Sequence, residues 1–229
     1  MLSQRATADE LMDAHDLPEA TYTAVMRDLA RVNTVTRARA PTLAFLDRIA
    51  KRHRGALRIL DVGFGDGDML RAIHRWAKHA GIDATLVGVD LNPRSLAAAR
   101  ASTPADMRIE FRIGDYDPLA DKHWDVIVSS LVAHHMTHDQ LIAFLRFMNA
   151  NVRWGWFIND LHRHGVAWLG YPLLARIAGW HPIVRHDGQL SIARSYRPDE
   201  WPPILQAAGV GGARVFRAFP FRLCVEKLR

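Results

Sequence analysis

The glycine-rich stretch Asp61-Val-Gly-Phe-Gly-Asp-Gly-Asp68 has the residue types and spacing that most clearly suggest chemistry. Its glycines alternate at positions 63, 65 and 67, and carboxylates stand at 61, 66 and 68. A dinucleotide-binding loop needs glycine or alanine at the sixth position of its fingerprint, where this chain has Asp68. A phosphate-binding loop needs a Lys-Ser/Thr pair after the glycines, and none follows here. Three carboxylates would also repel a pyrophosphate. The stretch therefore favours a ligand that carries positive charge.

S-adenosylmethionine (SAM) satisfies this condition, because it has a sulfonium, an ammonium, a ribose and an adenine but no phosphate. Asp90 ends a predicted strand and can accept hydrogen bonds from both ribose hydroxyls, which its charge strengthens. Asp115 is expected to accept from the adenine amino group, and Tyr116 to pack on the base. The alternatives are structural: the glycines form only a tight turn, Asp90 caps the next helix, and Asp115 is an ordinary loop acid.

The elements that would position these residues alternate between strand and helix, which predicts a mostly parallel sheet with helices on both faces. In such a sheet, ligands bind at the carboxyl ends of the strands. Helices are expected within residues 7–53, and residues 181–195 are expected to be a loop. The predicted strands are 56–62, 85–90, 107–113, 124–130, 152–158, 213–218 and 221–225, and the later helices are 67–79, 92–101, 137–149, 165–180 and 198–208. The last two strands are close enough to pair as a hairpin.

The chain resembles the class I SAM-dependent methyltransferases in the motifs DVGFGDGD (61–68), GVDLNP (88–93), GDYDPL (114–119) and WDVIVSSLVAHH (124–135). This resemblance covers about residues 56–160. It implies an α/β, Rossmann-like sheet of seven strands, mostly parallel, with an antiparallel C-terminal hairpin and helices on both faces. It also implies an N-terminal helical cap over residues 1–54, a SAM-binding domain over 55–229 and a substrate lid over 165–195. The implied cofactor-binding residues are Asp61, Gly63, Phe64, Gly65, Gly67, Asp90, Leu91, Asp115, Tyr116 and Ser130.

The residues after the fourth predicted strand bear on the methyl acceptor. Base methyltransferases carry an Asn/Asp-Pro-Pro-aromatic motif there, and this chain has 129–135 (SSLVAHH) instead, so no nucleic-acid partner is expected despite the net charge of +6. A catechol-type metal enzyme needs a carboxylate at the same place, and the twelve histidines show no convincing ligand spacing, so no metal is expected either.

A finer resemblance, carried by residues 157–171 and 184–201, is to ubiquinone and menaquinone methyltransferases and to small bacterial methyltransferases associated with polyketide phenols. It implies O-methylation of a small lipophilic phenol or quinol. The alternatives are C- or N-methylation of a small molecule, an RNA methyltransferase, or a SAM-binding protein without catalysis.

A phenol, with a pKa of about 10, needs a base near its oxygen at neutral pH, and histidine has a suitable pKa. Three histidines are expected at the carboxyl edge of the sheet: His135, His162 and His186. We favour His162, because Asp160 stands two residues before it and could orient a histidine. His134 is expected only at a helix entry. Ordinary structural histidines are the alternative, and methyl transfer by positioning alone needs no base.

The apolar segment 165–180 supplies Trp168 and Tyr171 as candidate substrate contacts, with a core helix as the alternative. The N-terminal helices, with Asn33, Arg37 and Arg39, are the other candidate lid, and one of these arginines is expected to meet the SAM carboxylate.

The single cysteine, Cys224, excludes an internal disulfide, is expected in a core strand, and favours the reducing cytoplasm. The N-terminus has no apolar leader segment, and the most apolar window, 166–175, is far shorter than the roughly 20 residues that a membrane span needs. No stable membrane insertion is therefore expected. The expected partner is a small-molecule acceptor, and nothing in the sequence indicates an oligomeric state.

Overall fold

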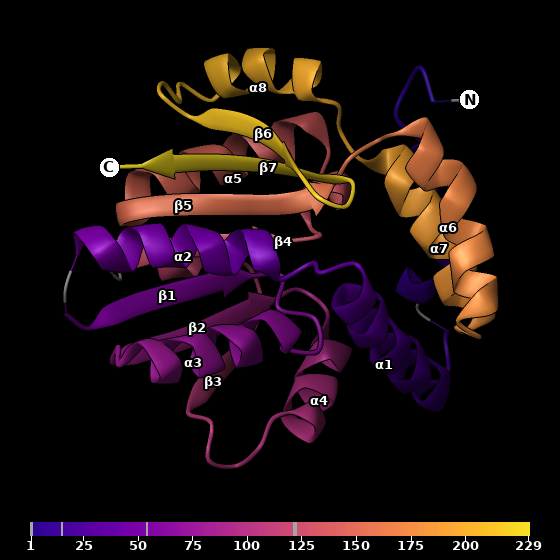
Figure 1. Cartoon of the computed structure of the whole chain (residues 1–229), viewed down its shortest axis with the longest axis horizontal. Helices are drawn as coiled ribbons and strands as arrows, with labels where there is room; N and C mark the ends of the chain where they lie inside the picture. The colour runs from indigo at the N-terminus through magenta and orange to yellow at the C-terminus, as the bar shows by residue number, and fades with distance from the viewer. Residues whose placement is uncertain (1, 15, 54, 121–122) are drawn as a thin grey trace.

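The computed structural model describes residues 2–14, 16–53, 55–120 and 123–229. Within these residues, seven strands form one sheet in the order β3-β2-β1-β4-β5-β7-β6 (Figure 1). The strands are β1 (Leu57–Val62), β2 (Ala84–Asp90), β3 (Ile109–Ile113), β4 (Trp124–Ser130), β5 (Val152–Leu161), β6 (Arg214–Ala218) and β7 (Arg222–Leu228). β1 to β5 pair in parallel, and β7 runs antiparallel to both β5 and β6. The predicted sheet is confirmed.

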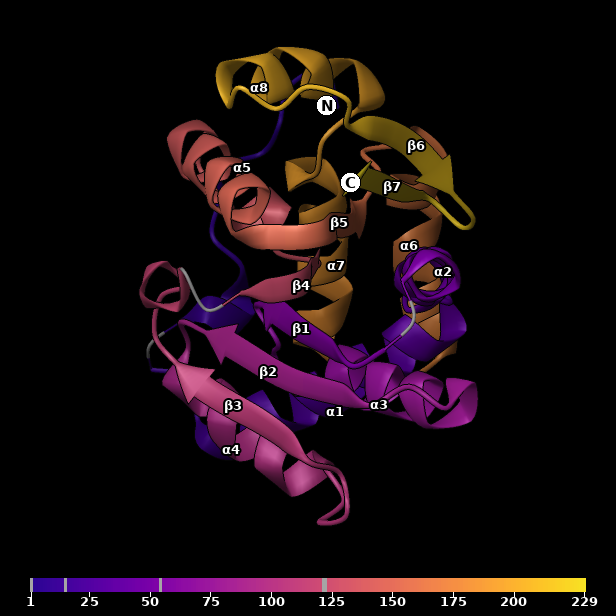
Figure 2. The same cartoon turned by 90° about the vertical axis from the view of Figure 1, so that its left-hand side faces the viewer.

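Two helical layers cover the sheet, because side chains along each strand point alternately to its two faces (Figure 2). Ile59 of β1 packs with α2 (Ala40–Arg52), α3 (Asp68–Ala80) and α4 (Pro93–Ser102). The next residue, Leu60, packs on the opposite face with α5 (His138–Asn151) and α8 (Trp201–Ala207). The remaining short turns of helix are η1 (Leu11–Asp13), η2 (Asp117–Leu119), η3 (Ala133–His135) and η4 (Pro198–Glu200).

Three further helices lie beyond the carboxyl ends of the parallel strands and are called the cap here: α1 (Glu19–Val35), α6 (Gly165–Ile177) and α7 (Pro182–Arg194) (Figure 1). The cap has a small core of its own, formed by Val25, Val32, Ala175, Trp180 and Val184. Because α2 packs on the sheet, the N-terminal part of the cap ends with α1.

The expected loop over 181–195 is wrong, because most of it forms α7. Its start has ordinary signals: Pro182 is the first helical residue, and the side chain of His181 accepts a hydrogen bond from the Ile183 amide at 3.2 Å. The rest of α7 has no apolar stripe that would predict a helix, because several of its buried residues are polar, among them Asp187. Gly188 is required because the Tyr171 ring lies against it, and an added Cβ would stand 2.2 Å from that ring.

Several local predictions are confirmed. Thr137 and Gln140 form a capping box at the start of α5, and Asn92 caps α4 by accepting from the Arg94 amide. Cys224 is a free, fully buried thiol in β7. Of the helices in the described part of the chain, none has the length and apolar character needed to cross a membrane.

Candidate active site

A cavity of about 730 Å³ lies between the carboxyl ends of the parallel strands and the cap. The loops after β1, β2, β3 and β4 form its floor, and residues of α1, α6 and α7 form much of its wall. Of the predicted cofactor-binding residues, all except Gly67 line it: Asp61, Gly63, Phe64, Gly65, Asp90, Leu91, Asp115, Tyr116 and Ser130. Gly67 directly precedes α3. A Cβ added at this position would meet the side chains of Phe111 and Arg71.

The loop after β1 has a backbone that only glycine adopts readily. Gly63, Gly65 and Gly67 have φ angles of +80°, +56° and +77°. At Gly63, an added Cβ would stand 2.2 Å from a methyl group of Val132. The loop is tied to the end of β2 by a hydrogen bond from the Gly63 amide to the Val89 carbonyl (2.8 Å).

Asp90 joins this loop to the next one. One carboxylate oxygen accepts from the Gly65 amide at 2.8 Å and the other from the Asn92 amide at 2.9 Å. These backbone bonds fix the carboxylate at the cavity wall, and each oxygen keeps a lone pair for a ligand hydroxyl. Asp115 is exposed at the rim, and the Tyr116 ring packs against Phe144 and Phe147.

Asp61 is a buried carboxyl group at the cavity, with 1% exposure and no hydrogen-bond partner on either oxygen. Burial raises the pKa of this carboxyl to about 8, and the nearby charges of Asp90 and Asp68 add to the effect. A cationic ligand would stabilise its ionised form.

Basic side chains at the same end are mostly paired. Arg39 lines the cavity and lies 3.1 Å from Asp68, whereas Arg71 binds Asp66 at 2.9 Å. Arg222 also lines the cavity but stands nearer to Asp160; it is almost fully buried, and two of its guanidinium nitrogens have no hydrogen-bond partner. These groups offer places for an anionic group of a ligand.

At the other side of the cavity, His134 lies between two carboxylates. Its Nδ1 is 2.7 Å from Asp160, whose second oxygen accepts from the His134 amide at 2.9 Å. Its Nε2 is 3.6 Å from Glu10 Oε1. Burial alone would lower the pKa of His134, but the charges of Asp160 and Glu10 outweigh it and raise the pKa to about 9.

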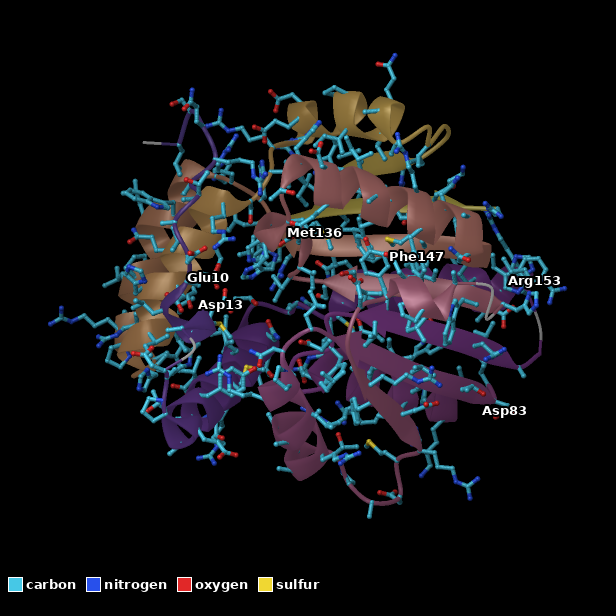
Figure 3. All side chains as sticks on the ribbon, turned by 180° about the vertical axis from the view of Figure 1, so that it is seen from behind. Glu10, Asp13, Asp83, Met136, Phe147 and Arg153 are labelled. Carbon is cyan, nitrogen blue, oxygen red and sulfur yellow. The ribbon has the colours of Figure 1, made fainter. Side chains whose placement is uncertain are left out.

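His135 stands beside His134, with ring centroids 4.2 Å apart. Its Nε2 is 3.8 Å from Glu10 Oε1, and its Nδ1 is 3.7 Å from Asp13. Burial and the charge of His134 lower the pKa of His135 to about 4. Glu10 and Asp13 lie on the cap side of the molecule, whereas Asp83 lies at the opposite end of the sheet (Figure 3).

Residues 59–155 match the family model described as a methyltransferase domain. The matched range holds the glycine loop, Asp61 and Asp90, which line the cavity described above. No curated protein sequence matches the chain.

Solved structures of methyltransferases share the fold. The chain is similar to human N-acetylserotonin methyltransferase in complex with SAM (17% identity, TM-score 0.65), covering 98% of this chain and 60% of that one. It is also similar to a plantazolicin methyltransferase in complex with a triazolic desmethylPZN analog and SAH (15% identity, TM-score 0.64), covering 87% of this chain and 72% of that one. A third is the CMeT domain of the citrinin polyketide synthase (16% identity, TM-score 0.61), where the match covers 83% of this chain and 52% of that one. The chain thus spans little more than half of the length of some of these proteins.

The predicted catalytic residues are not all brought together. His135 lines the cavity, and Asp160 binds His134. His162 does not line it: its amide donates to the Phe221 carbonyl, and its ring lies near His164. His186 of α7 also lies outside the cavity, and its ring contacts the adjacent Asp187.

The other predicted contacts divide in the same way. Tyr171 lines the cavity and Trp168 does not. Of the arginines considered for the SAM carboxylate, Arg39 lines the cavity and Arg37 does not, and Asn33 of the same N-terminal region also lines it.

Sequence reasoning missed Glu10 and Asp13 and gave His134 no functional role. Glu10 reaches the cavity because the Leu11 and Met12 amides donate to Asp187 of α7, at 3.0 and 2.9 Å. No local spacing signals a contact between segments so far apart in the chain. For His134, the sequence offered two signals of a functional role: the adjacent His135 and the acid in Asn159-Asp160.

The buried carboxyl of Asp61 predicts that SAM binding depends on pH. Below about pH 8 the free enzyme holds a proton on Asp61 that a cationic ligand displaces, so the association constant is expected to rise with pH and level off above 8. Calorimetry in buffers of different ionisation enthalpy should detect about one proton released per SAM near pH 7. Asp61→Asn should remove this release, and Asp83→Asn, an exposed acid far from the cavity, should keep it. No proton release in the parent enzyme would contradict the assignment.

The raised pKa of Asp61 has the opposite effect on the folding stability of the unliganded protein, which decreases as the pH rises. The folded chain keeps the proton up to about pH 8, whereas the unfolded chain releases it near 3.8. The contribution of Asp61 to folding stability is therefore expected to decrease as the pH rises between these values.

Proposed function

We propose that this protein is a SAM-dependent methyltransferase that moves the methyl group of SAM to a hydroxyl of a small lipophilic phenol or quinol. The observation that carries the proposal is that one cavity has a cation-accepting end, at Asp61 and Asp90, and a separate histidine and carboxylate group at His134, His135 and Glu10. An acceptor bound between these two ends of the cavity would place its hydroxyl near the histidines and would face the methyl group of the cofactor.

The cavity wall supports a lipophilic acceptor. Most of the surface that lines the cavity is apolar, with contributions from Met26, Leu29, Val32, Val166, Leu174 and Phe221. Such a lining suits an apolar small molecule fixed by a few polar contacts. We take α1 and residues 165–195 as the substrate lid, with Tyr171 in contact with the acceptor. The N-acetylserotonin, plantazolicin and polyketide enzymes with this fold support small-molecule chemistry in general. A role in secondary metabolism and a place in the cytoplasm belong to the same proposal.

The reaction is a displacement at the methyl carbon. The acceptor oxygen supplies the electron pair for the new carbon–oxygen bond, the carbon–sulfur bond breaks, and the sulfur keeps its electrons. The hydroxyl proton passes to the imidazole of His135, which is neutral at pH 7 because its pKa is lowered to about 4, and from there to solvent. His135 is the group that we place against this oxygen, and Asp160 is a positioning residue, because it holds His134 beside His135. His162 and His186 lie outside this arrangement.

A labelled-methyl assay tests the proposal. Purified enzyme and methyl-labelled SAM would be incubated with alkylated phenols and quinols and, as matched controls, with their O-methyl ethers. We expect an ether product from the free hydroxyl compounds and no transfer to the blocked ones. Label on ring carbon or nitrogen would instead establish C- or N-methylation, and label on RNA would establish a nucleic-acid enzyme. Tight SAM binding with no transfer to any acceptor would indicate a binding protein.

A further inference from the structure

We propose that Glu10, His134 and His135 form a binding site for a divalent transition-metal ion, which holds the acceptor oxygen. The inference rests on the proposed function for the role of the ion. The site itself follows from the arrangement of the three side chains.

The first observation is a convergence of ligand atoms. One atom each of Glu10, His134 and His135 lies within 4.8 Å of the others. The Nε2 atoms of the two histidines face the same carboxylate oxygen, Glu10 Oε1, at 3.6 and 3.8 Å. These separations exceed a hydrogen bond. They are close to the roughly 3.3 Å between neighbouring ligand atoms around a tetrahedral ion with bonds of about 2.0–2.1 Å.

The second observation is that each histidine has a carboxylate behind it. Asp160 lies 2.7 Å from the Nδ1 of His134, and Asp13 lies 3.7 Å from the Nδ1 of His135. Metal-binding histidines generally donate their other ring N–H to a carboxylate or carbonyl, which fixes the ring and leaves the facing nitrogen for the ion. The His134 imidazole is arranged in this way, and Asp13 stands near the Nδ1 of His135 but beyond hydrogen-bond distance.

The third observation is that the carboxylate ligand is held in place. Glu10 is buried, and Ser191 donates to its Oε1 at 2.6 Å. The following amides are bound to Asp187. A ligand held from both sides loses little side-chain freedom when an ion binds.

The ligand set indicates the kind of ion and its chemistry. Two imidazoles and one carboxylate suit zinc, iron(II), cobalt(II) or manganese(II) better than magnesium or calcium, which favour oxygen ligands. All three residues line the cavity, so a remaining coordination position can face the acceptor. There an ion would polarise the acceptor hydroxyl, which loses its proton to solvent as the oxygen attacks the methyl group.

Cobalt(II) is a direct probe, because its visible absorption reports imidazole ligation. The full chain, stripped with a chelator and dialysed, would be titrated with Co²⁺ alone. We expect one Co²⁺ per chain, displaced by Zn²⁺. His135→Ala and Glu10→Gln should weaken binding about 100-fold, and Asp160→Asn about 10- to 100-fold. His162→Ala and His79→Ala, outside the cavity, should bind as the parent does. Thermal unfolding with and without SAM checks that each variant is folded.

Absence of Co²⁺ binding at micromolar concentration, or unchanged binding in folded His135→Ala and Glu10→Gln, overturns the inference. The labelled-methyl assay keeps the two proposals apart. A metal-free enzyme that methylates phenols at the full rate disproves the role of the ion and leaves the proposed function intact. Stoichiometric Co²⁺ binding by the three residues without methylation of any phenol supports the site and contradicts the proposed function.

Discussion

Replacing His135 with alanine is expected to lower kcat about 10²- to 10⁴-fold, the range for losing a group that assists proton removal. The reason is its place: His135 lines the cavity with about a third of its side chain exposed, and both of its ring nitrogens face carboxylates. Either the His135 ring accepts the proton of the acceptor hydroxyl, or it helps to hold the ion that polarises this hydroxyl. Both routes depend on the His135 side chain. Single-turnover methyl transfer measures the effect, and calorimetry should show SAM affinity unchanged within about twofold, since the residue lies apart from Asp61 and Asp90.

The matched control is His79→Ala, which removes an exposed imidazole at the end of α3, outside the cavity. It should keep the parent kcat. If His135→Ala also keeps it, the acceptor loses its proton without help from this histidine, and catalysis is positioning of two substrates alone.

Gly65→Val is expected to weaken SAM binding about 100-fold or more, because two effects add. A branched side chain at φ +56° costs about 1–3 kcal/mol of backbone strain. The new side chain also enters the cavity, where its Cβ would already lie 3.3 Å from Met26, and its backbone would no longer hold Asp90 in place. Isothermal titration with SAM is the measurement.

Gly81→Val separates strain from obstruction. Gly81 ends α3 with φ +67°, has open space around its missing Cβ, and does not line the cavity. It should lose folding stability but keep its SAM affinity. Equal SAM affinities in the two variants would mean that the loop after β1 is only a turn.

The parts of the fold that the sequence predicts well have local causes. The strand β1, the glycine loop and α3 follow one another with a clear change from apolar run to glycines to helical spacing. Asp90 and Asp115 fall at the sheet edge because parallel strands end there together, and so the cofactor side of the cavity could be predicted.

The acceptor side depends on long-range contacts instead. α7 was missed because it buries Asp187 and Ser191, which give no apolar periodicity. Those same two residues hold the segment of Glu10, so missing the helix also meant missing the residue that faces His134. Local spacing around His162 suggested a base there, whereas Asp160 uses both oxygens on His134.

The docking of Glu10 on α7 has a consequence for how the enzyme is made. Glu10 leaves the ribosome early, but its partner Ser191 follows 181 residues later. At about 5–20 residues per second, the interval is roughly 10–35 s. The proposed cofactor residues, the last of which is Ser130, are all synthesised before α7. A nascent chain therefore contains the residues of the proposed cofactor side first, and the contact between Glu10 and α7 forms only when synthesis is nearly finished.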